Sequence, residues 1–155
     1  MSFLTYSLVS AASFSGLFAG AALAFIAPEE MDIGRKHFSM LRKIFFSILI
    51  LSFGFFYSRQ SIMAALLFVV LGSLFIFLAN KKFIYPILGA LFYSSNIDIV
   101  LFEITAISIF LMGLPMGTLF AEEHKKMKKM MILKKLFLQN AMFFVICLPL
   151  YFLKF

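Results

Sequence analysis

A single acidic residue, Glu103, lies well inside a long apolar stretch of the chain, residues 99–121. An ionisable side chain at that depth in a bilayer costs at least about 2.5 kcal/mol, so it should be paired, protonated or turned towards a polar cavity. Asp98, Asn96 and Thr105 are close in sequence and offer further polar atoms. Together these residues predict an ion or proton site. The alternative is that Glu103 reaches outward to the membrane surface or accepts a hydrogen bond from a nearby hydroxyl.

The same stretch contains a segment, Gly113 to Gly117, with a proline at its centre. Pro115 removes one backbone donor and, between two glycines, can kink or break a helix. Gly117 follows Glu103 by fourteen positions, which on a helix brings the two within about 40° of one face. A broken helix beside a carboxylate is one way in which transporters build an ion site. The spacing therefore predicts a hinge at residues 113–117 that serves Glu103.

Acidic residues and histidines also gather in two further places, each just after an apolar stretch. They are Glu29, Glu30, Asp32 and His37 in the first group, and Glu122, Glu123 and His124 in the second. If the two stretches pack side by side, the groups meet and could bind a divalent metal or act as acids and bases. No spacing among them is diagnostic of a metal, and neighbouring Lys and Arg residues could neutralise them in salt-bridged loops instead.

The motifs of common enzymes are missing from the sequence. No GxSxG, HExxH, P-loop or GxGxxG pattern occurs. The single cysteine, Cys147, excludes an intramolecular disulfide and a CxxC site. We therefore expect no cofactor and favour a protein that is not an enzyme.

Membrane-spanning helices must position these candidate residues. The chain has 155 residues, 63% of them hydrophobic and 14% charged, and its mean hydropathy is +1.04. Soluble domains carry about 45–50% apolar and about 25% charged residues, so a water-soluble fold is excluded. The sequence predicts an all-α integral membrane protein, a single transmembrane domain over residues 1–155 with a bundle of six helices. Their ranges are about 5–27, 44–57, 61–79, 83–95, 99–121 and 136–154.

The basic residues predict the orientation. Twelve of the 14 Lys and Arg residues follow the first, third and fifth ranges, and only Arg59 and Lys154 fall on the other side. The positive-inside rule then places both termini outside and the basic loops in the cytoplasm of a prokaryotic cell, with the protein in the cell membrane. No basic residue precedes the first apolar stretch, so we expect that stretch to be a retained span and not a signal peptide. Residues 83–95 are short for a crossing and could be re-entrant, but a true crossing keeps the basic loops together.

Lysines and methionines between His124 and Met131 are spaced like the two faces of a helix. This pattern predicts a helix lying on the inner leaflet against anionic lipid.

Small residues recur at every fourth position in two of the predicted helices. They are Ala12, Gly16, Gly20 and Ala24 in the first, and Gly113 and Gly117 in the fifth. Such stripes let helices approach closely, either between subunits or within one chain. In both helices the glycines are followed by a Glu-Glu pair and a basic loop, which suggests a parallel internal repeat of spans 1–2 and 5–6; common membrane patterning could also produce the likeness.

These observations favour transport, by a channel, a carrier or a transporter subunit for an ion or small solute, with Glu103 at its site. One alternative is a non-catalytic scaffold or assembly subunit of a membrane complex. A second is a lipid-active membrane enzyme that uses the two acidic groups. The expected partners are the bilayer, anionic lipids at the basic loops, and a second copy or a membrane partner subunit. The net charge of +7 follows the topology and gives no reason to expect nucleic acid.

Overall fold

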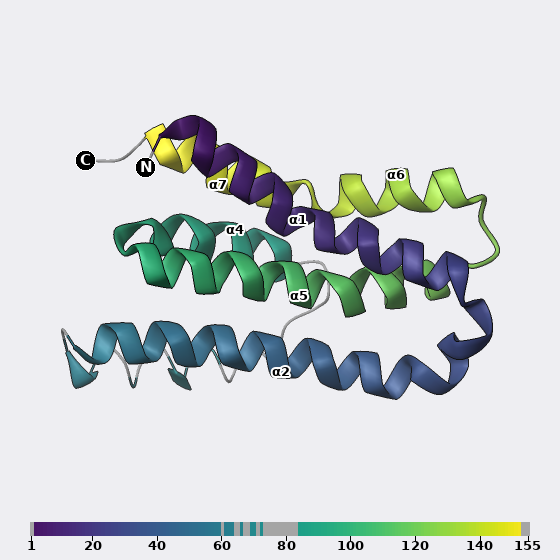
Figure 1. Ribbon diagram of the computed structural model, residues 1–155, viewed down its shortest axis with the longest axis horizontal. Helices are drawn as coiled ribbons and strands as arrows, with labels where there is room; N and C mark the ends of the chain where they lie inside the picture. The colour runs from purple at the N-terminus through teal and green to yellow at the C-terminus, as the bar shows by residue number, and fades with distance from the viewer. Residues whose placement is uncertain are drawn as a thin grey trace.

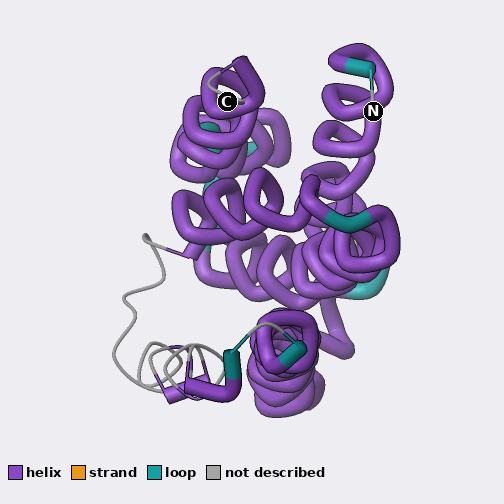
Figure 2. Tube along the Cα trace, turned by 90° about the vertical axis from the view of Figure 1, so that its left-hand side faces the viewer, coloured by secondary structure: helices purple, strands orange, loops and turns teal. Residues whose placement is uncertain are grey.

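Figure 1 and Figure 2 show the computed structural model, in which the described regular structure is helical. The structure describes residues 2–59, 61–63, 66, 69–70, 72 and 84–152, without the side chains of residues 30–33. In these ranges the helices are α1 (Phe3–Ile26), η1 (Pro28–Glu30), α2 (Met31–Ser58), α4 (Ile84–Ser94), η3 (Ser95–Ile97), α5 (Ile99–Glu123), α6 (Lys129–Asn140) and α7 (Met142–Phe152). The predicted all-α class is confirmed.

Three described helices are long and apolar enough to cross a bilayer: α1, α5, and the part of α2 from Gly34 to Ser58. The bent pair of α6 and α7 makes a fourth crossing if it is a single span. Large apolar side chains are exposed on these helices, as a lipid-facing surface requires; they include Leu4, Leu8, Leu51, Ile107 and Val145. The chain is therefore a small multi-pass membrane protein. Helices match the predicted ranges 5–27 and 99–121, while 61–79 lies largely outside the described residues.

The second predicted range, 44–57, is only the apolar part of a longer helix. α2 begins at Met31, so Arg35 and Arg42 lie on a helix and not in the predicted loop. Pro28 and Glu29 sit in the 3-10 turn before α2, and both residue types favour the start of a helix. At about 1.5 Å per residue the 28 residues of α2 extend about 42 Å, longer than the hydrocarbon core.

The fourth predicted range, 83–95, forms a helix that is too short to cross a bilayer by itself. α4 has 11 residues and extends about 16 Å, roughly half of the hydrocarbon thickness. It is followed at once by η3, and Asp98 then caps α5 by accepting a hydrogen bond from the Leu101 amide at 2.9 Å. α4 and α5 thus form a tight helical hairpin.

The last predicted range, 136–154, is not one straight helix. α6 begins at Lys129, and the chain bends by 40° between α6 and α7. The Asn140 side chain, which is buried, donates to the Leu136 carbonyl at 2.8 Å at the end of α6. A side chain that bonds to the carbonyls of its own helix is a known cause of bending. The expected surface helix over 124–131 is also wrong, because residues 124–127 form a turn and Lys128 is not helical.

α5 lies between α1 and α2, and α4 packs mainly on α7. Figure 1 shows α1 and α5 running in the same direction and α2 running back. Both termini lie at one end of the bundle, whereas the α1–α2 and α5–α6 connections lie at the other. We call the latter the lysine-rich end, because the α5–α6 connection carries Lys125, Lys126 and Lys128.

An aromatic cluster fills the core towards the other end of the bundle. The Phe92 ring lies 4.9 Å from that of Phe102 and 5.7 Å from that of Phe143, centroid to centroid. Tyr6 packs on Phe92 at 5.2 Å, and its hydroxyl donates to the Cys147 carbonyl at 3.0 Å. These contacts join α1, α4, α5 and α7 into one packed unit.

Candidate functional site

The backbones of α1 and α5 are in close contact at their glycines. A Cβ added at Gly16 or Gly20 would overlap the carbonyl oxygen of Phe110 or Leu114, and one added at Gly117 would overlap that of Leu17. The two small-residue stripes therefore face each other within one chain. Of the two alternatives, packing within one chain is the one that the structure shows for Gly16, Gly20, Gly113 and Gly117.

The same interface carries a hydrogen bond between the two helices. The buried Thr118 hydroxyl lies 3.0 Å from the Gly20 carbonyl and 2.8 Å from the Leu114 carbonyl of its own helix. The carbonyl at Gly20 is within reach because the glycine has no side chain to hold α5 away. Thr118 thus fixes the register in which the two glycine stripes meet.

The predicted hinge at residues 113–117 is not a break in the structure. α5 is one continuous helix from Ile99 to Glu123, with Pro115 buried inside it. Gly113 and Gly117, on either side of the proline, pack against the backbone of α1, and this contact supports α5 where Pro115 interrupts its hydrogen bonds. A bend between two apolar helices is instead found between α6 and α7.

The four residues predicted as an ion site differ in burial and in the hydrogen bonds that they make. Glu103 is exposed on the surface of the described helices, whereas Thr105 is buried and donates to the Leu101 carbonyl at 2.7 Å. Asp98 is used as the cap of α5. Asn96 is half-buried, and its side-chain nitrogen has no hydrogen-bond partner among the described residues. Among the described residues, no hydrogen bond joins Glu103 to any of the other three.

An ion pair at the lysine-rich end joins the second acidic group to a basic residue of α2. Arg35 of α2 lies 3.8 Å from Glu122 of α5, whose side chain is only 9% exposed. Glu29 and His37 are exposed, and the side chain of Glu30 lies outside the described residues. Among the side chains that the structure describes, no three His, Cys, Asp or Glu residues lie close enough to hold a metal ion. The salt-bridged alternative fits Glu122.

A large cavity opens at the lysine-rich end between α1, α5 and α6. Its volume is about 830 Å³, within the range of small-molecule and lipid-headgroup sites. Charged and polar residues that line it are Arg42, Glu123, His124, Lys134, Lys135 and Gln139. Apolar residues make up most of the remaining wall, among them Leu17, Met116, Leu119 and Leu136. We call this space the basic cavity.

His124 is fixed inside the basic cavity by contacts on both ring nitrogens. Lys135 Nζ lies 2.9 Å from His124 Nε2, and a lysine ammonium can only donate, so Nε2 must accept. The proton of the neutral ring is then on Nδ1, which donates to the Phe120 carbonyl at 2.9 Å. The ring also stacks on Phe120, with centroids 4.3 Å apart. This arrangement holds the Lys135 ammonium at the ring nitrogen of an uncharged histidine.

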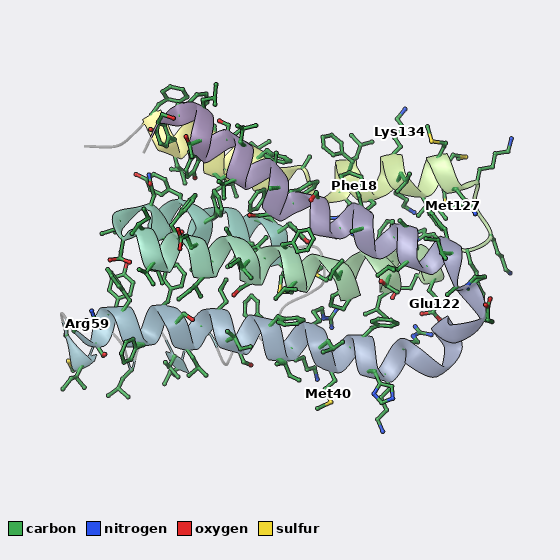
Figure 3. All side chains as sticks on the ribbon, viewed as in Figure 1. Phe18, Met40, Arg59, Glu122, Met127 and Lys134 are labelled. Atoms are coloured by element: carbon green, nitrogen blue, oxygen red, sulfur yellow. The ribbon has the colours of Figure 1, made fainter. Side chains whose placement is uncertain are left out.

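The remaining charges of the basic cavity come from three different helices. Arg42 reaches it from α2 and is half-buried, and Glu123 at the end of α5 is the lining carboxylate. Lys134 is exposed, and Figure 3 shows it extending from α6 away from α1, so it lies at the rim. The cavity thus combines a cationic rim with a largely apolar wall.

Sequence reasoning named His124 and Glu123 but missed Arg42, Lys134 and Lys135 as site residues. These cations were used only to predict the orientation in the membrane, because the distribution of basic residues among loops indicates a side of the membrane and not a binding site. The signal that could have found Lys134 and Lys135 is their mixture with methionine and leucine in residues 127–139; no such signal marks Arg42. No protein-family model, curated protein or solved structure matches this chain.

Proposed function

We propose that this multi-pass membrane protein binds an anionic amphiphile in the basic cavity. The observation that carries the proposal is the composition of the cavity itself, in which Arg42, Lys134 and Lys135 stand beside a wall of leucine and methionine. An amphiphile has an anionic head for the cations and an apolar body for the wall. A small hydrophilic anion would leave that wall unused.

The position of the cavity supports the same ligand. The lysine-rich end also carries Arg35, Lys125 and Lys129, so the surrounding potential is positive. Polybasic segments near a membrane surface attract anionic lipid by about 1 kcal/mol per cation. Lipid headgroups are concentrated at that depth of the membrane, whereas soluble anions must diffuse to it.

For the topology we propose six spans in the cytoplasmic membrane, with the short helix α4 crossing where the bilayer is locally thinned. Both termini are then outside and the basic cavity is in the cytoplasm. Two observations support this orientation: the α1–α2 and α5–α6 connections lie at the same end, and Arg59 lies at the opposite end (Figure 3). We also propose that spans 1–2 and 5–6 form a parallel internal repeat. The common direction of α1 and α5 supports it.

Lipid binding is tested on the full chain in detergent by native mass spectrometry with dioctanoyl phosphatidylglycerol and dioctanoyl phosphatidylcholine. We expect the anionic lipid to bind about tenfold or more tightly, and the Lys134→Ala/Lys135→Ala double variant to lose most of that preference. The matched control is Lys126→Ala/Lys128→Ala, which removes the same charge from the same end outside the cavity. Equal losses in both double variants would show non-specific attraction and reject the site.

Transport through Glu103 stays a prediction, with a separate test. In proteoliposomes, Glu103→Gln should abolish any ion-coupled flux and its pH dependence if the carboxylate is the ion site. Because Glu103 is exposed and the basic cavity lies towards the opposite end of α5, the same substitution should leave lipid binding unchanged. Flux that persists in the variant rejects Glu103 as the site.

A further inference from the structure

We infer that the basic cavity selects a lipid with a phosphate monoester headgroup over lipids whose phosphate is a diester. The inference rests on the proposed function and names the chemical class of its ligand. Three features carry it: the charge balance of the cavity, the donors left free on Lys135, and the apolar wall that accepts the lipid body.

The charge balance of the lining residues is that of a dianion site. Arg42, Lys134 and Lys135 contribute three positive charges, Glu123 contributes one negative charge, and the hydrogen bonds of His124 require a neutral ring. The lining therefore has an excess of two positive charges. A phosphate monoester carries about −1.5 to −2 charges at pH 7, whereas a phosphate diester carries about one negative charge. The monoester balances the excess more completely.

Lys135 is held in a position that leaves donors for a phosphate. One N–H of its ammonium is used by His124 Nε2, and an ammonium has three. Because the acceptor is an uncharged ring, this bond fixes the direction of the side chain without neutralising it. Two donors are thus available to terminal phosphate oxygens. A monoester has three such oxygens, a diester has only two, and each bond to a charged oxygen is a strong one.

The wall of the cavity indicates that the phosphate belongs to a lipid. Leu17 of α1 and Met116 of α5 line one part of the cavity, and α6 adds Met131, Leu136 and Leu138. Burial of the methylene groups of a lipid chain against such a wall is favourable. Inorganic phosphate cannot use this contribution, so it should bind more weakly than a lipid phosphate of the same charge.

The test compares dioctanoyl phosphatidic acid, dioctanoyl phosphatidylglycerol and inorganic phosphate as ligands of the full chain in detergent at pH 7.5. We expect the phosphatidic acid to bind about tenfold more tightly than the phosphatidylglycerol, which corresponds to about 1.4 kcal/mol. Inorganic phosphate should compete only at much higher concentration. Lys135→Gln should reduce the preference for the monoester to near unity, Lys135→Arg should retain it, and the control Lys126→Gln should not change it.

The outcomes separate this inference from the proposed function. If the two anionic lipids bind equally tightly, and the Lys134→Ala/Lys135→Ala variant binds both more weakly, the monoester preference is overturned. The proposal that the cavity binds anionic lipid is then retained. Inorganic phosphate that binds as tightly as phosphatidic acid overturns the assignment to a lipid. Failure of either lipid to bind better than phosphatidylcholine overturns both.

Discussion

Residues of the same type on the same helix make different contacts in this chain. Thr105 and Thr118 are both buried in α5, but Thr105 donates only to Leu101 of its own helix, whereas Thr118 also reaches Gly20 of α1. Lys135 is fixed on His124, while Lys134 extends from the rim. Contacts across helices, and not residue types, distinguish the members of each pair.

The threonine pair gives a matched test of the bond between α1 and α5. Thr118→Val should lower the free energy of unfolding by about 0.6 kcal/mol, and by at most about 1.7 kcal/mol, the range for hydrogen bonds between membrane helices. Thr105→Val should have a smaller effect, since its bond lies within one helix. The chain has no Trp, so unfolding is followed by far-UV circular dichroism during titration with denaturing detergent. Equal losses would show that the Gly20 contact contributes nothing.

At the scale of helices, the sequence predicts the apolar cores of the spans better than their ends. Hydropathy locates α1 and α5 within a few residues, because their apolar stretches stop at charged residues. It places the start of α2 too late, because charged residues can continue a helix beyond the bilayer. It misses the bend after Asn140, because hydropathy does not indicate which side chain donates a hydrogen bond to a carbonyl of the same helix, as Asn140 does to Leu136.

The contact between α1 and α5 should tolerate no added carbon atom. Gly117→Ala places a methyl group against the Leu17 carbonyl, and overpacking of this kind costs about 1–3 kcal/mol. The control is Gly34→Ala, where the nearest atom is Cε2 of the Phe38 ring at 2.8 Å, a side chain that can turn away. The control should be neutral or gain up to about 1 kcal/mol from helix propensity. The same unfolding titration measures both, and similar values for the two would contradict the close contact.

For the whole molecule, the sequence predicts the class but not the site. Twelve cations on one side of a membrane follow from charge counting, and the structure places the described loops among them at one end. The basic cavity could not be predicted, because Arg42, Glu123 and Lys135 come from three helices whose packing is decided at glycines elsewhere. The prediction of a site at Glu103 rests on residues that are close in sequence, and these differ in burial, since Thr105 is buried and Glu103 is exposed.

The proposed orientation is tested by labelling introduced cysteines in intact cells. The native Cys147 is buried and is removed by Cys147→Ala, and Ser2→Cys or Lys126→Cys is then added singly. A membrane-impermeant maleimide should label the variant at residue 2 from outside, and the variant at residue 126 only after permeabilisation. The reverse pattern would invert the protein and place the basic cavity outside the cell.

The packing of α1 on α5 also has a consequence for the order of biosynthesis. Phe110, which meets Gly16, is 94 residues further along the chain. At about 5–20 residues per second, roughly 5–20 seconds separate the synthesis of the two surfaces. Throughout that interval α1 is present without the helix that its glycine stripe fits. Insertion of this protein therefore requires a first helix that waits in the membrane, and the final bundle can close only after α5 has emerged.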